Sequence, residues 1–210
     1  MKNKTLTILI TGCLLVILGA CGHSQERAGT QEIAQQNLAS LKKVDTSLEK
    51  FETLEDEMMD ALAKDLKSSR SESLISKQKG AVGKNFKARQ KELTIVQDEM
   101  LNIQKTIQTL EDYQQKKAVD LPKEDVTQAI ATLTQLNKTY EAFAHYATEA
   151  KESEETFYKK YKADLNQEDI TTYLSKINLA HGALFQQLEV LTADLSSGNA
   201  SMKALDKAVE

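Results

Sequence analysis

The sequence predicts an all-α protein: an elongated antiparallel bundle of three to four long amphipathic, coiled-coil-like helices, preceded by a cleaved signal peptide and a flexible tether. The 210 residues include eight Gly, one Pro and no Trp, and 28% are charged, a composition that suits long helices. Apolar residues recur at spacings of three and four along most of the chain, as on the buried stripe of a helix. A sheet domain would need more Gly, Pro and β-branched residues.

The first twenty residues are typical of a bacterial signal peptide. Lys2 and Lys4 make a basic start, and the mostly apolar run 5–17 is shorter than the roughly 20 residues that span a bilayer. The run leads into a lipobox, which consists of Leu18, Gly19, Ala20 and Cys21. We therefore expect cleavage between Ala20 and Cys21, a diacylglyceryl group on the Cys21 thiol, and a protein anchored in the cell membrane that faces outward into the cell-wall space.

Processing changes both the cysteine count and the charge. Cys13 would leave with the signal, so the mature chain would keep one capped Cys and form no disulfide. Loss of Lys2 and Lys4 would lower the formal charge from -4 to -6. A negative chain is a poor partner for nucleic acid, because neutralising phosphates needs a basic surface. We expect a signal peptide over 1–20, a lipidated Cys and flexible tether over 21–30, and a helical bundle over 31–208.

The first helix is predicted to follow the tether, to run for about 38 residues and to end near residues 68–71. Its stripe comprises Leu41, Val44, Leu48, Phe51, Leu54, Met58, Leu62 and Leu66. The next helix continues from Phe86 to Leu110, and from Leu93 onward its apolar steps alternate strictly between three and four residues, a heptad seam.

A third helix is predicted to start at Pro122, a residue suited to the first helical position. Residues 166–169 form a variant capping box that begins the last long helix, and residues 196–199, Ser-Ser-Gly-Asn, are expected to stop it. Whether the third and fourth helices are one bent helix stays open at this stage. Short connections predict antiparallel neighbours and a rod-shaped bundle.

Few residues suggest chemistry. His145 has Glu141 and Glu149 four residues to either side, but a solvated helix face explains them better than a metal site. His181 falls on the apolar seam, so we expect a packed, hydrogen-bonded histidine with pH sensitivity as the alternative. The Gly-rich stretch 80–85 lacks the spacing of a phosphate loop and predicts a hinge or helix irregularity. We expect neither an enzyme nor a bound metal or cofactor.

One stretch near the end of the third helix mixes aromatic and basic side chains. Contact with the sugars and phosphates of wall polymers is conceivable for Lys151, Tyr158, Lys159, Lys160 and Lys162. The simpler explanation is that Phe157 and Tyr161, four residues apart, belong to the core while the lysines are solvated.

Several short segments, in this order, resemble the YkyA-type cell-wall-binding lipoproteins of Gram-positive bacteria: the lipobox, Tyr140-Glu141-Ala142-Phe143, Glu155-Thr156-Phe157-Tyr158, Asp164-Leu165-Asn166-Gln167-Glu168 and Ile177-Asn178. The resemblance spans nearly the whole chain and is densest from Tyr140 onward. It implies a lipid anchor, a helical body and association with the cell wall, and it supplies no catalytic residues.

Two functions remain open on the sequence. The first is a structural or interaction lipoprotein, a membrane-tethered rod that contacts peptidoglycan, another wall polymer or a protein. The second is a helical adaptor that docks a membrane enzyme or transporter through an exposed apolar seam. A contiguous exposed apolar patch would favour the adaptor.

Overall fold

The computed structural model describes residues 25–116 and 119–210, and all regular secondary structure in these ranges is helical. The signal peptide and lipobox lie outside the described residues. The helices are α2 (Gln25–Asp56), α3 (Met58–Leu66), α4 (Ser71–Ser76), α5 (Ala81–Lys116), α6 (Lys123–Lys160) and α7 (Gln167–Val209). The predicted helical bundle is therefore confirmed.

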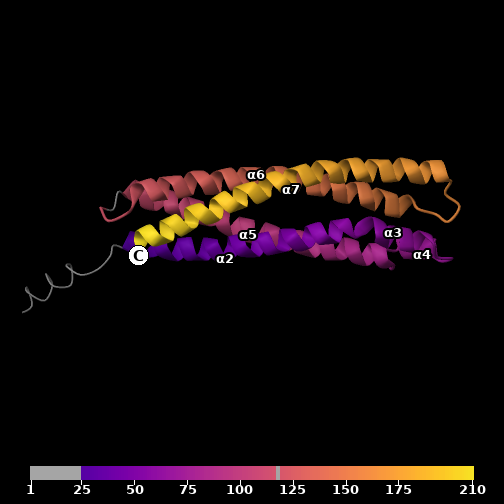
Figure 1. The fold of residues 1–210 in the computed structure, drawn as a ribbon, viewed down its shortest axis with the longest axis horizontal. Helices are drawn as coiled ribbons and strands as arrows, with labels where there is room; N and C mark the ends of the chain where they lie inside the picture. The colour runs from indigo at the N-terminus through magenta and orange to yellow at the C-terminus, as the bar shows by residue number, and fades with distance from the viewer. Residues whose placement is uncertain (1–24, 117–118) are drawn as a thin grey trace, which may run out of the picture.

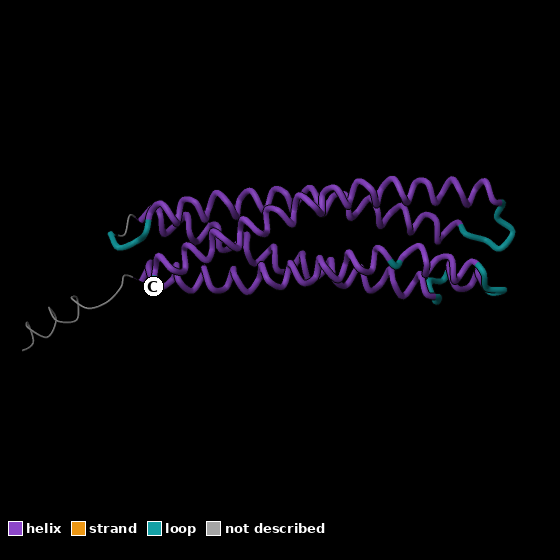
Figure 2. Tube along the Cα trace, viewed as in Figure 1, coloured by secondary structure: helices purple, strands orange, loops and turns teal. Residues whose placement is uncertain are grey.

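The four long helices form a closed ring (Figure 1). α2 packs against α5 and α7, and α6 packs against the same two helices, so each long helix has two neighbours that run antiparallel to it. At 1.5 Å per residue the 43 residues of α7 span about 65 Å. The molecule is a rod, and its loops lie mostly at the two ends (Figure 2).

The two ends differ in what they contain. At one end, here called the base, α2 begins and α7 ends: the Arg27 guanidinium donates to the carbonyl of Ala208, and Gln35 donates to Asp206. The opposite end, here called the distal end, holds α3, α4 and the turn between α6 and α7.

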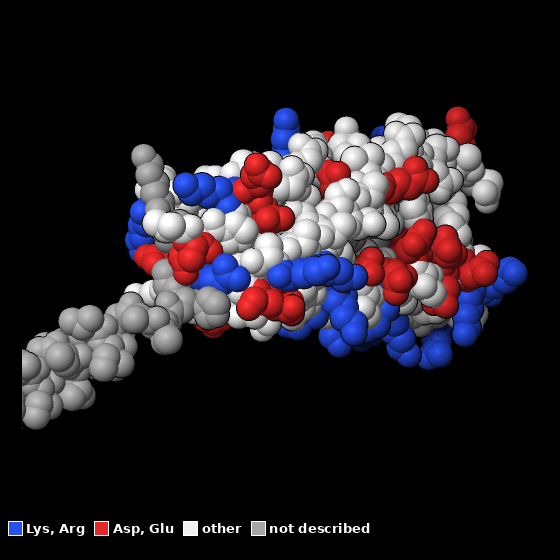
Figure 3. Space-filling view, turned by 60° about the vertical axis from the view of Figure 1, so that its left-hand side comes forward, with Lys and Arg blue, Asp and Glu red and all other residues white. Residues whose placement is uncertain are grey.

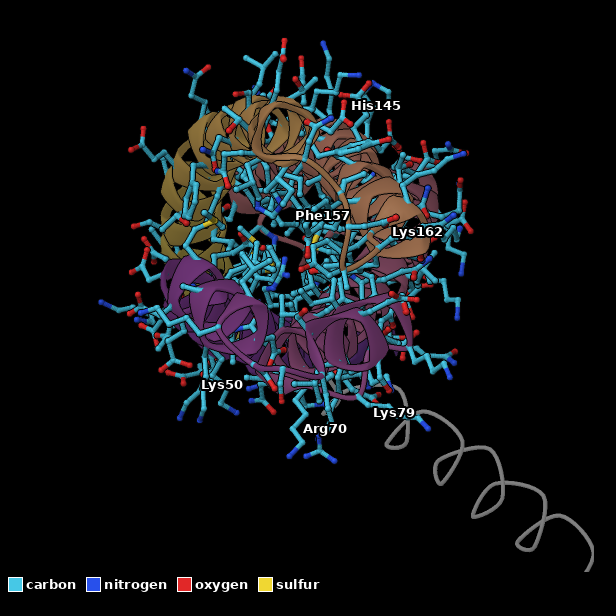
Figure 4. All side chains as sticks on the ribbon, turned by 90° about the vertical axis from the view of Figure 1, so that its right-hand side faces the viewer. Lys50, Arg70, Lys79, His145, Phe157 and Lys162 are labelled. Carbon is cyan, nitrogen blue, oxygen red and sulfur yellow. The ribbon has the colours of Figure 1, made fainter. Side chains whose placement is uncertain are left out.

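Two apolar clusters fill the bundle. The shaft core extends from the base to a level marked by Phe51, Val96, Ala150 and Leu184. The distal core consists of Met58, Leu62, Ile75, Val82, Phe86, Phe157, Tyr158, Tyr161 and Ile177. The view down the rod in Figure 4 shows Phe157 inside the ring of helices and Lys50, Arg70, Lys79 and His145 at its periphery.

The predicted tether is too long. α2 begins at Gln25, and Thr30 is fully buried, so residues 25–30 are helical rather than a flexible linker. Their polar composition hid this, because the partners that hold them come from elsewhere in the chain. The Arg27 side chain, for example, also donates to the carbonyl of Asp120, 93 residues away.

The predicted stop at residues 196–199 is wrong, because α7 continues through them to Val209. Gly198 is buried, and a Cβ there would lie 3.5 Å from side-chain carbons of Leu41 and Leu136. That distance is ordinary van der Waals contact, so this position simply faces the core between α2 and α6, and the apolar stripe then continues with Met202 and Leu205.

The remaining boundaries follow local chemistry. Asn166 caps α7 by accepting from the Asp169 backbone N–H at 2.8 Å, as the capping pattern predicted, and α6 and α7 are separate helices. Pro122 was predicted to be the first helical residue of α6, but it is the N-cap, and the helix begins one residue later at Lys123. Glu57 interrupts the predicted first helix between α2 and α3.

The glycine-rich stretch forms the start of α5. Asp65, at the end of α3, accepts from the backbone N–H groups of Ala81 and Val82 at 3.0 and 2.9 Å. A carboxylate therefore already occupies the positive N-terminal end of α5, where a phosphate loop would bind its anion. At the place where a hinge or helix irregularity was predicted, the structure has a turn and then the regular start of α5.

Candidate functional site

A layer of charged side chains separates the shaft core from the distal core. Each long helix contributes one member: Glu55 from α2, Arg89 from α5, Glu154 from α6 and His181 from α7. All four are buried, with exposed fractions of 5%, 1%, 1% and 5%. We call these four residues the charge layer.

Arg89 lies at the centre of this layer. Its Nη1 donates to Glu55 Oε1 at 2.6 Å and to Glu154 Oε1 at 2.7 Å, while Nη2 donates to Glu154 Oε2 at 2.6 Å. Its Nε donates to Asn85 Oδ1 at 2.8 Å, and the Asn85 amide donates in turn to the carbonyl of Leu54. The guanidinium thus pairs with both carboxylates, and with Glu154 through two parallel bonds.

His181 closes the layer from the other side. Its Nδ1 makes a short hydrogen bond to Glu55 Oε2, and its Nε2 lies 3.0 Å from Glu154 Oε1. Each ring nitrogen faces a carboxylate oxygen, which can only accept. This arrangement favours the doubly protonated imidazolium.

The pKa directions agree with this geometry. Burial alone would lower the pKa of His181, but the hydrogen bonds and charges of Glu154 and Glu55 outweigh it and raise the pKa to about 9. Burial would raise the pKa of Glu154, but hydrogen bonds from His181 and Arg89 lower it to about 2. Two cations and two anions therefore make a buried layer with no net charge.

Tyr158 extends the network toward the distal core. Its hydroxyl donates to Glu154 Oε2 at 2.6 Å, and its ring lies edge-on to that of Phe86, with centroids 5.7 Å apart. Burial and the negative charge of Glu154 raise the pKa of the Tyr158 phenol.

Ligand atoms of Glu55, Glu154 and His181 lie within 4.8 Å of one another, close enough to bind one metal ion. Two observations argue against that use. Arg89 already places a cation within 2.7 Å of both carboxylates. A proton on each ring nitrogen would leave His181 no lone pair to donate. The chemistry of the set favours a structural ion network over a metal site.

The sequence did contain a signal for the charge layer. Glu55 lies four residues after core residue Phe51, and Glu154 four residues after core residue Ala150. The same spacing of three and four residues passes through Arg89 and His181. Only His181 was predicted to be buried, and that prediction is confirmed; the other three are strongly charged residues that sequence patterns assign to the surface.

The basic and aromatic residues proposed to contact wall polymers do not form one surface. Tyr158 is 2% exposed and hydrogen-bonded inside the bundle, so its selection as a contact residue is wrong. Phe157 and Tyr161 belong to the distal core, as the simpler explanation required. The exposed lysines of this segment are Lys159, Lys160 and Lys162, and Lys151 is half-buried. Lys159 pairs with Glu155 at 3.2 Å.

His145 lies on a solvated face of α6, as predicted. Its side chain is 67% exposed, and its Nε2 lies 3.5 Å from Glu149 Oε1, whose side chain is 52% exposed. Glu141 instead accepts from Asn137.

Among the described residues, no helix has both the length and the apolar composition needed to cross a bilayer. Comparison of the chain with protein-family models, with curated proteins and with solved structures gives no match.

Proposed function

We propose that this protein is a membrane-anchored extracytoplasmic lipoprotein whose helical body is a rigid rod that binds the cell wall. Cys21 carries the diacylglyceryl anchor, and the bundle extends outward from the membrane to contact peptidoglycan or another wall polymer. The lipobox and the resemblance to YkyA-type lipoproteins support this proposal. We propose no catalytic role.

The position of the bundle relative to Cys21 is the observation that carries the proposal. α2 begins at Gln25, only four residues after Cys21. Four residues reach at most about 14 Å, so a lipid on Cys21 would hold the base close to the membrane. The distal end would then lie about 60 Å farther out, in the space that the wall occupies.

The anchor can be tested apart from wall binding. Replacing Cys21 with Ala should abolish labelling by a radioactive or clickable fatty acid and leave unprocessed precursor. A matched Cys13→Ala variant should be labelled and cleaved normally, because Cys13 lies in the discarded segment. Normal lipid labelling of the Cys21→Ala chain would refute the anchor.

Wall binding is tested with the full chain extracted in detergent and mixed with purified cell-wall sacculi. Saturable co-sedimentation supports the proposal. Absence of co-sedimentation at low salt would refute it and move the function to a protein partner.

A second candidate, an adaptor for a membrane enzyme or transporter, is supported by the outer face of α7. Leu179 is 77% exposed and Val190 is 48% exposed, and they lie eleven residues apart, which is three helical turns. Replacing both with Glu should abolish cross-linking to a membrane protein in living cells if this face docks a partner. The same change should leave binding to sacculi intact.

A further inference from the structure

Charge is unevenly distributed over this acidic protein. Residues 61–91 carry eight exposed basic side chains, Lys64, Lys67, Arg70, Lys77, Lys79, Lys84, Lys87 and Lys91. The same segment has one exposed acidic side chain, Glu72, because Asp65 is buried as the cap of α5. The exposed side chains of this segment thus have a surplus of seven positive charges, although the whole chain has a formal charge of -4.

The eight residues lie on three helices that pack together and in the turns that join these helices. The second half of α3, α4 and the first turns of α5 contact one another at the distal end. Figure 3 shows basic side chains gathered along the lower edge of the molecule toward that end, and Figure 4 shows Arg70 and Lys79 pointing outward from the same side of the bundle. We call this surface the basic patch.

The basic side chains of the patch are not held in ion pairs in the part of the chain that the structure describes. Within the described ranges, none of its eight side chains lies within ion-pair distance of a carboxylate. Lys43 on the shaft is different, because its ammonium group pairs with Glu99 at 2.7 Å. Unpaired basic side chains on one surface give a field that attracts a polyanion.

A groove within the basic patch could accommodate a segment of a polymer. It has a volume of about 750 Å³ and runs between α3 and α5, where Lys64, Lys79 and Lys84 are among the lining side chains. Two acidic residues, Glu57 and Asp60, also line it, so the lysines outnumber the exposed acids by one.

We infer that the basic patch binds an anionic phosphodiester polymer of the cell wall. The inference rests on the proposed wall-binding function and names its ligand class. Lysine ammonium groups bind phosphates as point charges and need no fixed angular arrangement, which suits a flexible repeating polymer. The anionic headgroups of the anchoring membrane are a less suitable ligand, because α2 and α3 carry the chain about 60 Å from the base before Lys67 is reached.

The test compares two variants of the full chain with the same change in net charge. The patch variant replaces Lys77, Lys79, Lys84 and Lys87 with Gln. The control variant replaces four exposed lysines elsewhere, Lys42, Lys50, Lys105 and Lys123. Thermal unfolding followed by circular dichroism establishes that both remain folded, as expected for exposed side chains.

Binding is measured on sacculi with and without their teichoic acids, on immobilised polyglycerol phosphate, and on vesicles of phosphatidylglycerol. We expect the unaltered chain and the control variant to bind teichoic-acid-bearing sacculi and polyglycerol phosphate. The patch variant should bind at least about tenfold more weakly, since each lysine beside an anionic surface contributes about a factor of five. Binding should also weaken as salt rises to about 0.3 M, because screening shortens the electrostatic range.

Each other outcome overturns something specific. Equal binding by the patch and control variants, or sacculus binding that survives removal of teichoic acids, would overturn the inference and leave wall binding intact. Binding to vesicles without binding to polyglycerol phosphate would assign the patch to a lipid surface and overturn the inference. If the unaltered chain bound neither sacculi nor polyglycerol phosphate, the inference and the proposed function would both fall.

Discussion

The shaft core and the distal core lie end to end inside one bundle, but their side chains differ in kind. The shaft core consists mainly of Leu, Ile, Val, Met and Ala from four long helices. Four of the nine residues of the distal core are aromatic, and two short helices, α3 and α4, complete its walls. A repeating aliphatic stripe thus suffices where helices run unbroken, while the distal core depends on individual contacts such as the Asp65 cap.

The charge layer lies at the boundary between the shaft core and the distal core. Breaking it should have the largest effect on stability of the changes considered. Replacing Arg89 with Met leaves Glu55 and Glu154 buried with one cation between them. We expect the free energy of unfolding to fall by about 3–5 kcal/mol, the usual effect of breaking a buried ion pair from one side. Denaturant unfolding followed by circular dichroism measures this change.

Hydrogen exchange should show that Arg89→Met loosens α3, α4 and the first turns of α5 more than the shaft. Lys43→Met is the control, because it breaks a pair whose lysine is 62% exposed, and it should lower stability by about 1 kcal/mol or less. If the two variants lost equal stability, the charge layer would not be the boundary that we describe.

The charge layer should also make stability depend on pH in two windows. Because the pKa of His181 is raised from 6.5 to about 9, its stabilising effect is complete below pH 6.5 and is lost as pH rises toward 9. The pKa of Glu154 is lowered from 4.5 to about 2, so its effect is complete above pH 4.5 and is lost as pH falls toward 2. Stability should therefore be greatest between about pH 4.5 and 6.5.

The alkaline loss should reach up to about 3 kcal/mol, since each pKa unit corresponds to about 1.4 kcal/mol. Unfolding free energies measured from pH 6 to pH 10 test this, and a His181→Gln chain should show a flatter profile. A profile equally steep in that variant would place the titrating group elsewhere.

A smaller effect should come from the cap of α5, which belongs to the distal region alone. Replacing Asp65 with Ala removes two hydrogen bonds to the Ala81 and Val82 amides and should cost about 1–2 kcal/mol. Faster hydrogen exchange at these two amides would identify the cap as the cause. Asp65→Asn keeps an acceptor but loses the charge, so its stability should lie between that of the unaltered chain and that of Asp65→Ala.

Two glycines should give effects of opposite sign when they are replaced with Ala. A Cβ on Gly83 would lie 2.3 Å from the backbone oxygen of Gln78, whereas a Cβ on Gly182 would have nothing within 4 Å. Gly83→Ala should destabilise the distal end by about 1 kcal/mol or more through this clash. Gly182→Ala should stabilise α7 by about 0.5–1 kcal/mol through helix propensity. If both variants shifted the melting temperature in the same direction, the predicted difference between Gly83 and Gly182 would be wrong.

The sequence predicted the helices because their period is local, but it could not place contacts that join distant segments. Residues 196–199 have the composition of a helix stop, yet Gly198 packs against Leu41 and Leu136 and lies in mid-helix. Residues 25–30 appeared to be a linker because their partners, Asp120 and Ala208, lie 93 and 181 residues farther along the chain.

The charge layer was missed for a related reason. A charged residue at one core position is uninformative by itself, and its meaning depends on opposite charges at the same level of three other helices. Continuing the spacing of three and four residues through charged positions would have found Glu55, Arg89 and Glu154 as candidates. Only the antiparallel packing shows that they meet.

The arrangement of the chain ends gives the rod a mechanical property. Both ends of the described chain meet at the base, and the basic patch lies at the other end. Tension applied between Gln25 and the patch would therefore be carried along α2 and α3. Because both helices are packed along their length against the other long helices, the bundle would resist extension along its long axis.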